Sequence, residues 1–215
     1  MTLHLTRAVL PLCLVMAGAG ALLTGWEFRA PPPPMLAADR GEIAATAALG
    51  IGGDFTLVGP NGQPVTLASY RGRFVLMFFG YRYCPDVCPT ELAKVATALD
   101  GLGEAERARV AALFITIDPE RDTPAVLRDY TTLFHPAIQG LTGSAEQIAL
   151  AARNYRVFYE RRAEGRGPDD YLMDHSAFLY LLGPEGRPRL LFTSNVTPEV
   201  ILARLRASLA TPSAS

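Results

Sequence analysis

Two continuous apolar runs, residues 74–80 and 110–117, stand out in the hydrophobic pattern of the chain. Both are too short for an ordinary helix and are rich in aromatic or β-branched residues, which is typical of strands buried on both faces. A weaker pattern precedes them, because short apolar segments at residues 54–58 and 65–67 flank the turn sequence Gly-Pro-Asn-Gly at residues 59–62. This arrangement predicts a β-hairpin.

Four helices are expected, beginning near residues 90, 124, 145 and 198. The first has apolar residues at helical spacing and Pro89 in the favoured first position. The second and the fourth each begin with a Thr-Pro pair, in which the threonine caps the helix and the proline is its first residue. The third begins with the capping box formed by Ser144 and Gln147.

Further strands are predicted at residues 139–141, 156–160, 176–182 and 189–193, and a Gly-Pro-Glu-Gly turn joins the last two. Strands alternate with helices in the first half of the domain and pair as a hairpin in the second half. This order predicts an α/β fold of the thioredoxin-like kind, with a mixed β-sheet flanked by helices on both faces.

The N-terminal region differs from the rest of the chain in composition. Residues 8–26 carry no charge over 19 positions, and a helix of this length is about long enough to cross a ~30 Å hydrocarbon layer. We expect a transmembrane anchor, and a signal peptide cleaved near Ala17-Gly18-Ala19 is the competing interpretation. Four consecutive prolines and an alanine-rich stretch follow, as in a stalk. The predicted organisation is an anchor or signal peptide (1–29), a linker (30–50) and a thioredoxin-like domain (51–211).

Charge and cysteine content narrow the functional classes. The net charge is −1, with 20 basic and 21 acidic residues spread along the chain. No basic face for nucleic acid is therefore expected. Three cysteines are too few for a disulfide-stapled scaffold. Cys13 lies inside the apolar N-terminal segment as a small hydrophobe, so Cys84 and Cys88 remain as a pair that can act together.

The two cysteines each precede a proline, which disfavours helical backbone and predicts that Cys84 and Cys88 both lie on a loop. Cys88 is then expected at the positive end of the following helix, which lowers the pKa of its thiol. Three interpretations remain open: a structural disulfide, a thiol–disulfide exchange site, and a site for a soft metal such as Cu(I). A third ligand would favour the metal.

The chain has three histidines that could supply this ligand. His4 precedes the apolar segment and is expected on the other side of the membrane from the domain. His135 follows a predicted helix, where a histidine is usually a surface or capping residue. His175 begins the predicted strand 176–182, and such a histidine, taken alone, is more often a hydrogen-bonded edge residue than a ligand. Only its position at one end of the sheet could bring it near the cysteines.

Three motifs together resemble one known family. They are Gly-Tyr-Arg-Tyr-Cys-Pro-Asp-Val-Cys-Pro-Thr-Glu-Leu at residues 80–92, Asp-Pro-Glu-Arg-Asp-Thr-Pro at residues 118–124 and Tyr-Leu-Met-Asp-His-Ser at residues 171–176. In this order and spacing they closely resemble the motifs of the Sco/SenC proteins, which are membrane-anchored, thioredoxin-fold copper chaperones of respiratory oxidase assembly. The resemblance extends over about residues 53–209.

The resemblance implies that Cys84, Cys88 and His175 together bind one copper ion, as Cu(I) or Cu(II). Asp174 and Asp118 are candidates for orienting the histidine or the loop. The implied partners are the copper-bearing subunit of cytochrome c oxidase and a protein that donates copper.

Delivery of copper to the dinuclear copper centre of the oxidase is the implied function. The alternative is a thiol–disulfide oxidoreductase that reduces cysteines of the oxidase subunit or of other exported proteins, for which Cys84 and Cys88 suffice and His175 has no necessary role. The expected location is the inner membrane with the domain facing the periplasm, because no Arg- and Ser-rich transit peptide precedes Ala8.

Overall fold

A computed structural model describes residues 42–44, 49–163, 167 and 170–211. At its centre is a mixed sheet of six strands in the order β1-β10-β9-β4-β5-β6. These strands are β1 (Glu42–Ala44), β4 (Phe74–Gly80), β5 (Val110–Thr116), β6 (Ile138–Leu141), β9 (Leu179–Leu182) and β10 (Pro188–Phe192). The strands β4, β5 and β6 are parallel, whereas the pairs β4–β9, β9–β10 and β10–β1 are antiparallel.

The two central strands, β4 and β5, form the middle of the hydrophobic core. All seven residues of each strand are buried, in a register that runs from Phe74 opposite Val110 to Gly80 opposite Thr116. This confirms the prediction of two strands buried on both faces. Because the two strands are parallel, the loops that follow them leave the sheet at the same edge.

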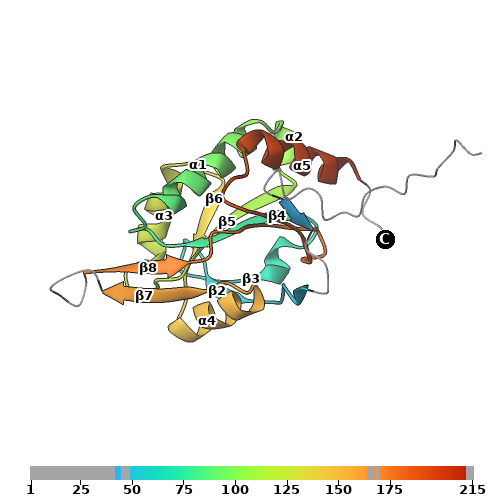
Figure 1. Ribbon diagram of the computed structural model, residues 1–215. Coiled ribbons are helices and arrows are strands. Elements are labelled where there is room, and N and C mark those ends of the chain that lie inside the picture. Colours follow the sequence, from blue (N-terminus) through green and yellow to red (C-terminus); the bar gives the residue numbers. More distant parts are fainter. Residues whose placement is uncertain (1–41, 45–48, 164–166, 168–169, 212–215) are drawn as a thin grey trace, which may run out of the picture. The chain divides into compact units, whose positions relative to one another are not determined.

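Helices cover both faces of the sheet (Figure 1). On one side lie α1 (Val87–Asp100), α3 (Pro124–Thr132) and α5 (Pro198–Ala210). On the other side lie α4 (Ala145–Asn154) and two hairpins, formed by β2 (Thr56–Val58) with β3 (Pro64–Thr66) and by β7 (Tyr159–Ala163) with β8 (Tyr171–His175). The short helix η3 (Leu67–Tyr70) connects β3 to β4, and the short helix α2 (Glu104–Arg107) connects α1 to β5. The predicted mixed α/β architecture and the first hairpin are confirmed.

The predicted helix starts agree with the structure at three places. The side chain of Thr123 accepts a hydrogen bond from the backbone N–H three residues later, at 3.4 Å. Ser144 and Gln147 form the complete capping box, with distances of 3.3 and 2.8 Å. The last helix begins at Pro198, although the side chain of Thr197 makes no capping hydrogen bond.

The start of α1 differs from the prediction. The helix begins at Val87, so Cys88 lies in its first turn and only Cys84 lies on the preceding loop. Pro89 is the third helical residue, at a position where a backbone N–H has no partner within the helix. The proline therefore costs the helix no hydrogen bond, and the helix can start earlier.

The strand that carries His175 also differs from the prediction. His175 is the last residue of β8, which pairs with β7, and it does not begin the strand β9. Residues 171–175 alternate between more and less buried positions, because Tyr171 and Met173 are buried and Leu172 and Asp174 are less so. This two-residue period is typical of a strand.

The predicted linker 30–50 contains the edge strand β1, which pairs with β10. Glu42 is 2% exposed and forms an ion pair with Arg204 of α5, with a shortest Nη2–Oε2 distance of 2.5 Å. Such a short strand depends on its partners rather than on its own composition. The predicted membrane segment lies outside the described residues. None of the helices in the described part of the chain is long and apolar enough to span a membrane.

Candidate metal centre

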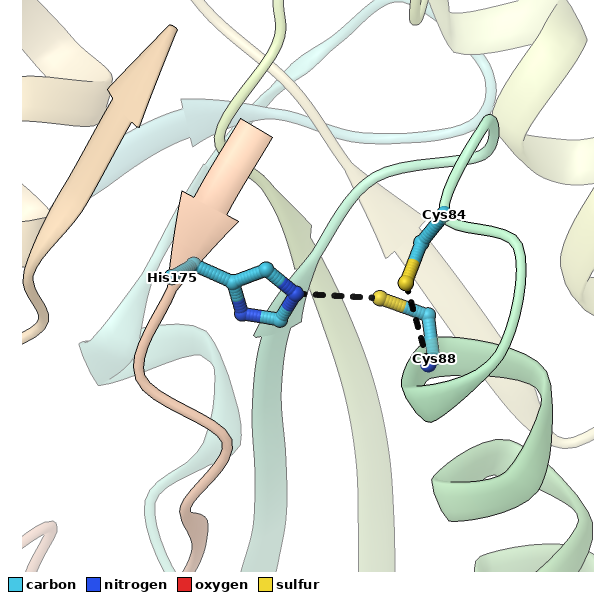
Figure 2. A group of neighbouring side chains, drawn as sticks. All are labelled: Cys84, Cys88 and His175. Carbon is cyan, nitrogen blue, oxygen red and sulfur yellow. Dashed lines mark hydrogen bonds between the residues drawn. The ribbon is translucent and has the colours of Figure 1, made fainter. Parts of the chain in front are cut away.

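Three elements bring Cys84, Cys88 and His175 together. Cys84 lies on the loop after β4, Cys88 in the first turn of α1, and His175 at the end of β8. One ligand atom from each residue lies within 4.8 Å of the other two. Figure 2 shows the imidazole pointing toward the two sulfur atoms from the opposite side of the cluster. Both cysteines are free thiols.

The orientation of the imidazole follows from its hydrogen bonds. The Nδ1 atom of His175 lies 2.9 Å from the carbonyl oxygen of Ser176. Since a carbonyl can only accept, Nδ1 carries the proton and donates it, which leaves the lone pair of Nε2 directed at the cysteines. Nε2 lies 3.4 Å from Sγ of Cys88 (Figure 2). This is the tautomer in which an imidazole can bind a metal through Nε2.

The two thiols have opposite electrostatic environments. A hydrogen bond from the Cys88 side chain is the largest cause that lowers the pKa of Cys84, to about 4, and burial opposes this shift. The backbone N–H of Cys88, whose nitrogen lies 3.3 Å from the Cys84 sulfur, also lowers this pKa. Burial, followed by the neighbouring Cys84 sulfur, raises the pKa of Cys88. Cys84 is therefore the thiolate and Cys88 the thiol at neutral pH.

This assignment corrects the prediction that the helix end lowers the pKa of Cys88. The backbone N–H groups of a first helical turn point out of the helix, toward the residue that precedes it. Here they stabilise the sulfur of Cys84 on the loop. Cys88 is inside the first turn and 0% exposed, so desolvation of a charged sulfur dominates there.

A cleft of about 330 Å³ reaches the cluster between the cysteine loop and the end of β8. Cys84 is 8% exposed and His175 is half-buried, so the site is open on one side. A larger cavity of about 730 Å³ is lined by residues 50–54 and 185–188 together with Leu67 and Arg71. It contains neither cysteine nor histidine, so the thiol chemistry belongs to the smaller cleft.

The two predicted orienting carboxylates have other partners. Asp174 forms an ion pair with Arg162, and the imidazole it was expected to orient is held by the Ser176 carbonyl instead. Asp118 is buried and accepts hydrogen bonds from the Tyr171 hydroxyl at 2.8 Å and from Nε of Arg121 at 2.5 Å. Asp118 thus acts through Arg121 rather than on His175. Asp174 lines the same cleft as His175, but its carboxylate is paired with Arg162.

His135 was expected to be a surface or capping residue, and it lies at a helix end but is not on the surface. Its side chain is buried, with Nε2 3.3 Å from Oδ1 of Asp100 and Nδ1 accepting the N–H of Ala137 at 3.0 Å. Nε2 therefore links the segment after α3 to the end of α1, and Nδ1 holds the local turn. His135 has no role in the candidate centre.

Sequence reasoning missed three residues around the cluster: Tyr81, Arg121 and Asp122. Asp122 is fully buried and accepts hydrogen bonds from the backbone N–H of Arg82, at 3.0 Å, and from the hydroxyl of Thr116, at 2.7 Å. It thereby fixes the start of the cysteine loop. The available signal was a charged residue directly before a helix cap, and the cap alone was taken to explain that segment.

Comparisons with a family model and with known proteins all point to one family. The family model described as SCO1/SenC matches residues 43–210. "Protein SCO2 homolog, mitochondrial" of Mus musculus is 41% identical over 201 residues, which are 92% of this chain and 78% of the mouse protein. "Protein SCO2, mitochondrial" of Saccharomyces cerevisiae is 40% identical over 143 residues, 66% of this chain, and the match spans only 48% of the yeast protein.

Solved structures agree with the sequence relatives. The structure of Bradyrhizobium japonicum ScoI with copper bound is 42% identical and superimposes with a TM-score of 0.68, covering 74% of this chain and 99% of that chain. The Bradyrhizobium structure therefore corresponds in length to the thioredoxin-like domain of this chain. A family model matches most of the chain and a relative is 41% identical over 92% of it, so the chain belongs to the SCO1/SenC family.

Proposed function

We propose that this protein is a copper metallochaperone that binds one copper ion through Cys84, Cys88 and His175. The observation that carries the proposal is the convergence of two sulfur atoms and an imidazole nitrogen within 4.8 Å. Thiolate sulfur and imidazole are ligands that suit copper, and sulfur in particular selects Cu(I). Copper is the cargo of such a protein rather than a resident cofactor.

The incomplete donor set supports a role in transfer. No fourth cysteine, histidine or carboxylate joins the group among the described residues. A structural zinc site needs four protein ligands, so this set is one short. Three ligands at the edge of an open cleft leave room for a group of the partner protein to approach the metal. A carrier that must release its cargo benefits from such an opening.

Proton and electron balance link metal loading to the state of the thiols. Cys84 is already a thiolate, whereas Cys88 must lose its proton before its sulfur can bind. If the pair is instead oxidised, the Cys84 thiolate and the Cys88 thiol form one disulfide and lose two electrons and the one remaining proton, and neither sulfur remains as a metal ligand. Copper loading therefore requires the reduced pair.

We infer delivery to the copper centre of cytochrome c oxidase from family membership, because the Sco/SenC proteins serve oxidase assembly. A second candidate is thiol–disulfide exchange, which is favoured by the lowered pKa of Cys84 on a thioredoxin-like fold. The two candidates differ in their use of His175, since exchange needs only the two cysteines.

Copper titration of the full chain tests the proposal. We expect the reduced protein, solubilised in detergent without oxygen, to bind one Cu(I) in competition with a chelator of known affinity. His175→Ala is expected to weaken binding more than about tenfold, because even residues around metal ligands contribute about 10- to 100-fold. Cys84→Ala and Cys88→Ala are expected to weaken it further.

The matched measurement is the reduction of a model disulfide by the same variants. His175→Ala should leave this rate within about twofold of wild type, since the histidine is not part of the exchange reaction. A His175→Ala protein that binds Cu(I) as tightly as wild type contradicts the three-ligand centre. Loss of exchange activity in Cys84→Ala and Cys88→Ala without any change in their copper affinity would favour the oxidoreductase.

We further propose that residues 8–26 anchor the protein to the membrane, on the basis of their uninterrupted apolar sequence. The full chain is expected to remain in the membrane pellet after an alkaline carbonate wash. A chain lacking residues 1–34 serves as the control and should be released. If the mature protein instead begins near residue 20 and is recovered in the soluble fraction, the segment is a cleaved signal peptide.

A further inference from the structure

His175 reaches the cysteines from a strand that is not part of the central sheet. Its strand β8 pairs with β7 in a separate hairpin, whereas Cys84 and Cys88 follow the central strand β4. The sheet therefore does not determine the distance between the histidine and the two sulfurs. That distance depends on side chains that connect β8 to the cysteine loop.

Tyr81 makes the first of these connections. It follows β4 directly and is 1% exposed. Its hydroxyl accepts the backbone N–H of Met173 at 3.1 Å, two residues before His175 on the same strand. Its ring meets the imidazole edge to face, with centroids 5.9 Å apart and an interplanar angle of 86°. Tyr81 thus holds both the backbone and the ring of the histidine segment.

Arg121 makes the second connection. Its guanidinium lies 3.6 Å from the ring centroid of Tyr171 on β8 and 4.7 Å from that of Tyr83, which adjoins Cys84. Its Nη1 atom donates to the backbone carbonyl of Tyr171 at 3.0 Å. One planar cation therefore stacks on the loop and on the strand at the same time.

Asp118 fixes the orientation of this cation. Its Oδ2 atom accepts from Nε of Arg121 at 2.5 Å, and its Oδ1 atom accepts from the hydroxyl of Tyr171 at 2.8 Å. If Asp118 only stabilised the turn between residues 118 and 121, its carboxylate would contact Arg121 alone. Here the carboxylate also binds a residue 53 positions away, so the network spans the two halves of the site.

We propose that Tyr81 and Arg121 are positioning residues that dock β8 against the cysteine loop before copper arrives. Their effect is to hold Nε2 of His175 beside the sulfur of Cys88 in the metal-free protein. A site whose ligands are already in place spends less binding free energy on ordering them. This inference rests on the proposed copper centre.

The test uses the full chain with Tyr81→Phe and Arg121→Lys. Tyr81→Phe keeps the ring and removes the acceptor, and we expect Cu(I) affinity to fall about two- to tenfold, the range of one neutral hydrogen bond. Arg121→Lys keeps the charge and removes the planar stacking group, and we expect a loss of about tenfold. In both variants the nitrogen hyperfine signal of His175 in the Cu(II) spectrum should weaken while the sulfur-to-copper absorption persists.

Two control variants separate positioning from stability. Tyr180→Phe also removes a buried hydrogen bond between a tyrosine hydroxyl and the backbone, here donated to the Tyr155 carbonyl at 2.8 Å, away from the cysteine loop. It should lower the melting temperature and leave copper affinity unchanged. Arg161→Lys alters a cation 4.0 Å from the same Tyr171 ring, but Arg161 is exposed and paired with Glu120. It should also leave copper affinity unchanged.

A metal-free measurement keeps this inference separate from the proposed function. The backbone N–H of Met173 should exchange with solvent faster in Tyr81→Phe than in wild type, because its acceptor is gone. If wild type binds no copper, the proposed function fails while this exchange rate still reports the docking. The positioning role is wrong if both variants, Tyr81→Phe and Arg121→Lys, match wild type in copper affinity, in the Cu(II) spectrum and in the exchange rate of Met173.

Discussion

Replacing Gly80 with alanine is expected to weaken copper binding by about 5- to 150-fold, the equivalent of the ~1–3 kcal/mol that overpacking of a core costs. Gly80 ends β4, and a Cβ atom there would lie 2.6 Å from Sγ of Cys88 and 2.8 Å from Cε2 of Phe114. Both neighbours are fully buried. We expect the Cys88 sulfur to move from its present position beside His175 to relieve the overlap, and metal binding must then reverse that movement.

The control for this substitution is Gly167→Ala, because a Cβ at Gly167 meets nothing within 4 Å. It should bind copper as wild type does. The measurements are chelator competition for affinity and thermal unfolding for stability. If Gly80→Ala keeps wild-type affinity and merely unfolds at a lower temperature, the strain is absorbed by Phe114 and the sulfur position is unaffected.

Reaction of the metal-free, reduced protein with iodoacetamide is expected to show a second large effect, at Cys84. Between pH 7 and pH 5 the rate at an ordinary thiol falls about 100-fold, because only the thiolate reacts. The pKa of Cys84 is lowered to about 4, so its thiolate should persist over this interval and be lost only as the pH falls through about 4. The rate at Cys84 should therefore change less than about twofold from pH 7 to pH 5.

Two variants at Cys88 test the cause of this behaviour. The hydrogen bond from the Cys88 side chain is the largest cause of the lowered pKa. Cys88→Ala removes this donor, so the rate at pH 5 should fall relative to pH 7. Cys88→Ser retains a donor and should resemble wild type. Mass spectrometry identifies the alkylated residue. A 100-fold decline for wild-type Cys84 would show that its thiolate is not stabilised.

The elements predicted from sequence are those whose signals are local. The two buried strands β4 and β5 follow from continuous apolar runs, and the starts of α3 and α4 follow from capping residues that act over three positions. The edge strand β1 and the strand β8 were not predicted, because both are short and depend on distant partners. The hydrophobic pattern of a short segment does not show which distant strand it will pair with.

The predicted start of α1 was wrong for a related reason. The rule that a residue before proline avoids helical backbone is a steric preference, which the surroundings can outweigh. The sulfur of Cys84 accepts the N–H of Cys88 and provides the first turn with a partner. This placement also moved the lowered pKa from Cys88 to Cys84. A displacement of two residues at one helix end thus changed the chemical assignment of both thiols.

By itself, the sequence determined the type of fold, the presence of two neighbouring cysteines, Cys84 and Cys88, that can act together, and a chemistry limited to disulfides or a soft metal. Neighbours along the chain suffice for these, because hydrophobic period, caps and cysteine spacing act over a few residues. Only the tertiary structure decided that His175, 87 positions beyond Cys88, lies beside the Cys88 sulfur. It also decided which thiol carries the charge. Burial in the folded core raises the pKa of Cys88, and the folded loop places the Cys84 sulfur where the Cys88 side chain and backbone N–H lower its pKa.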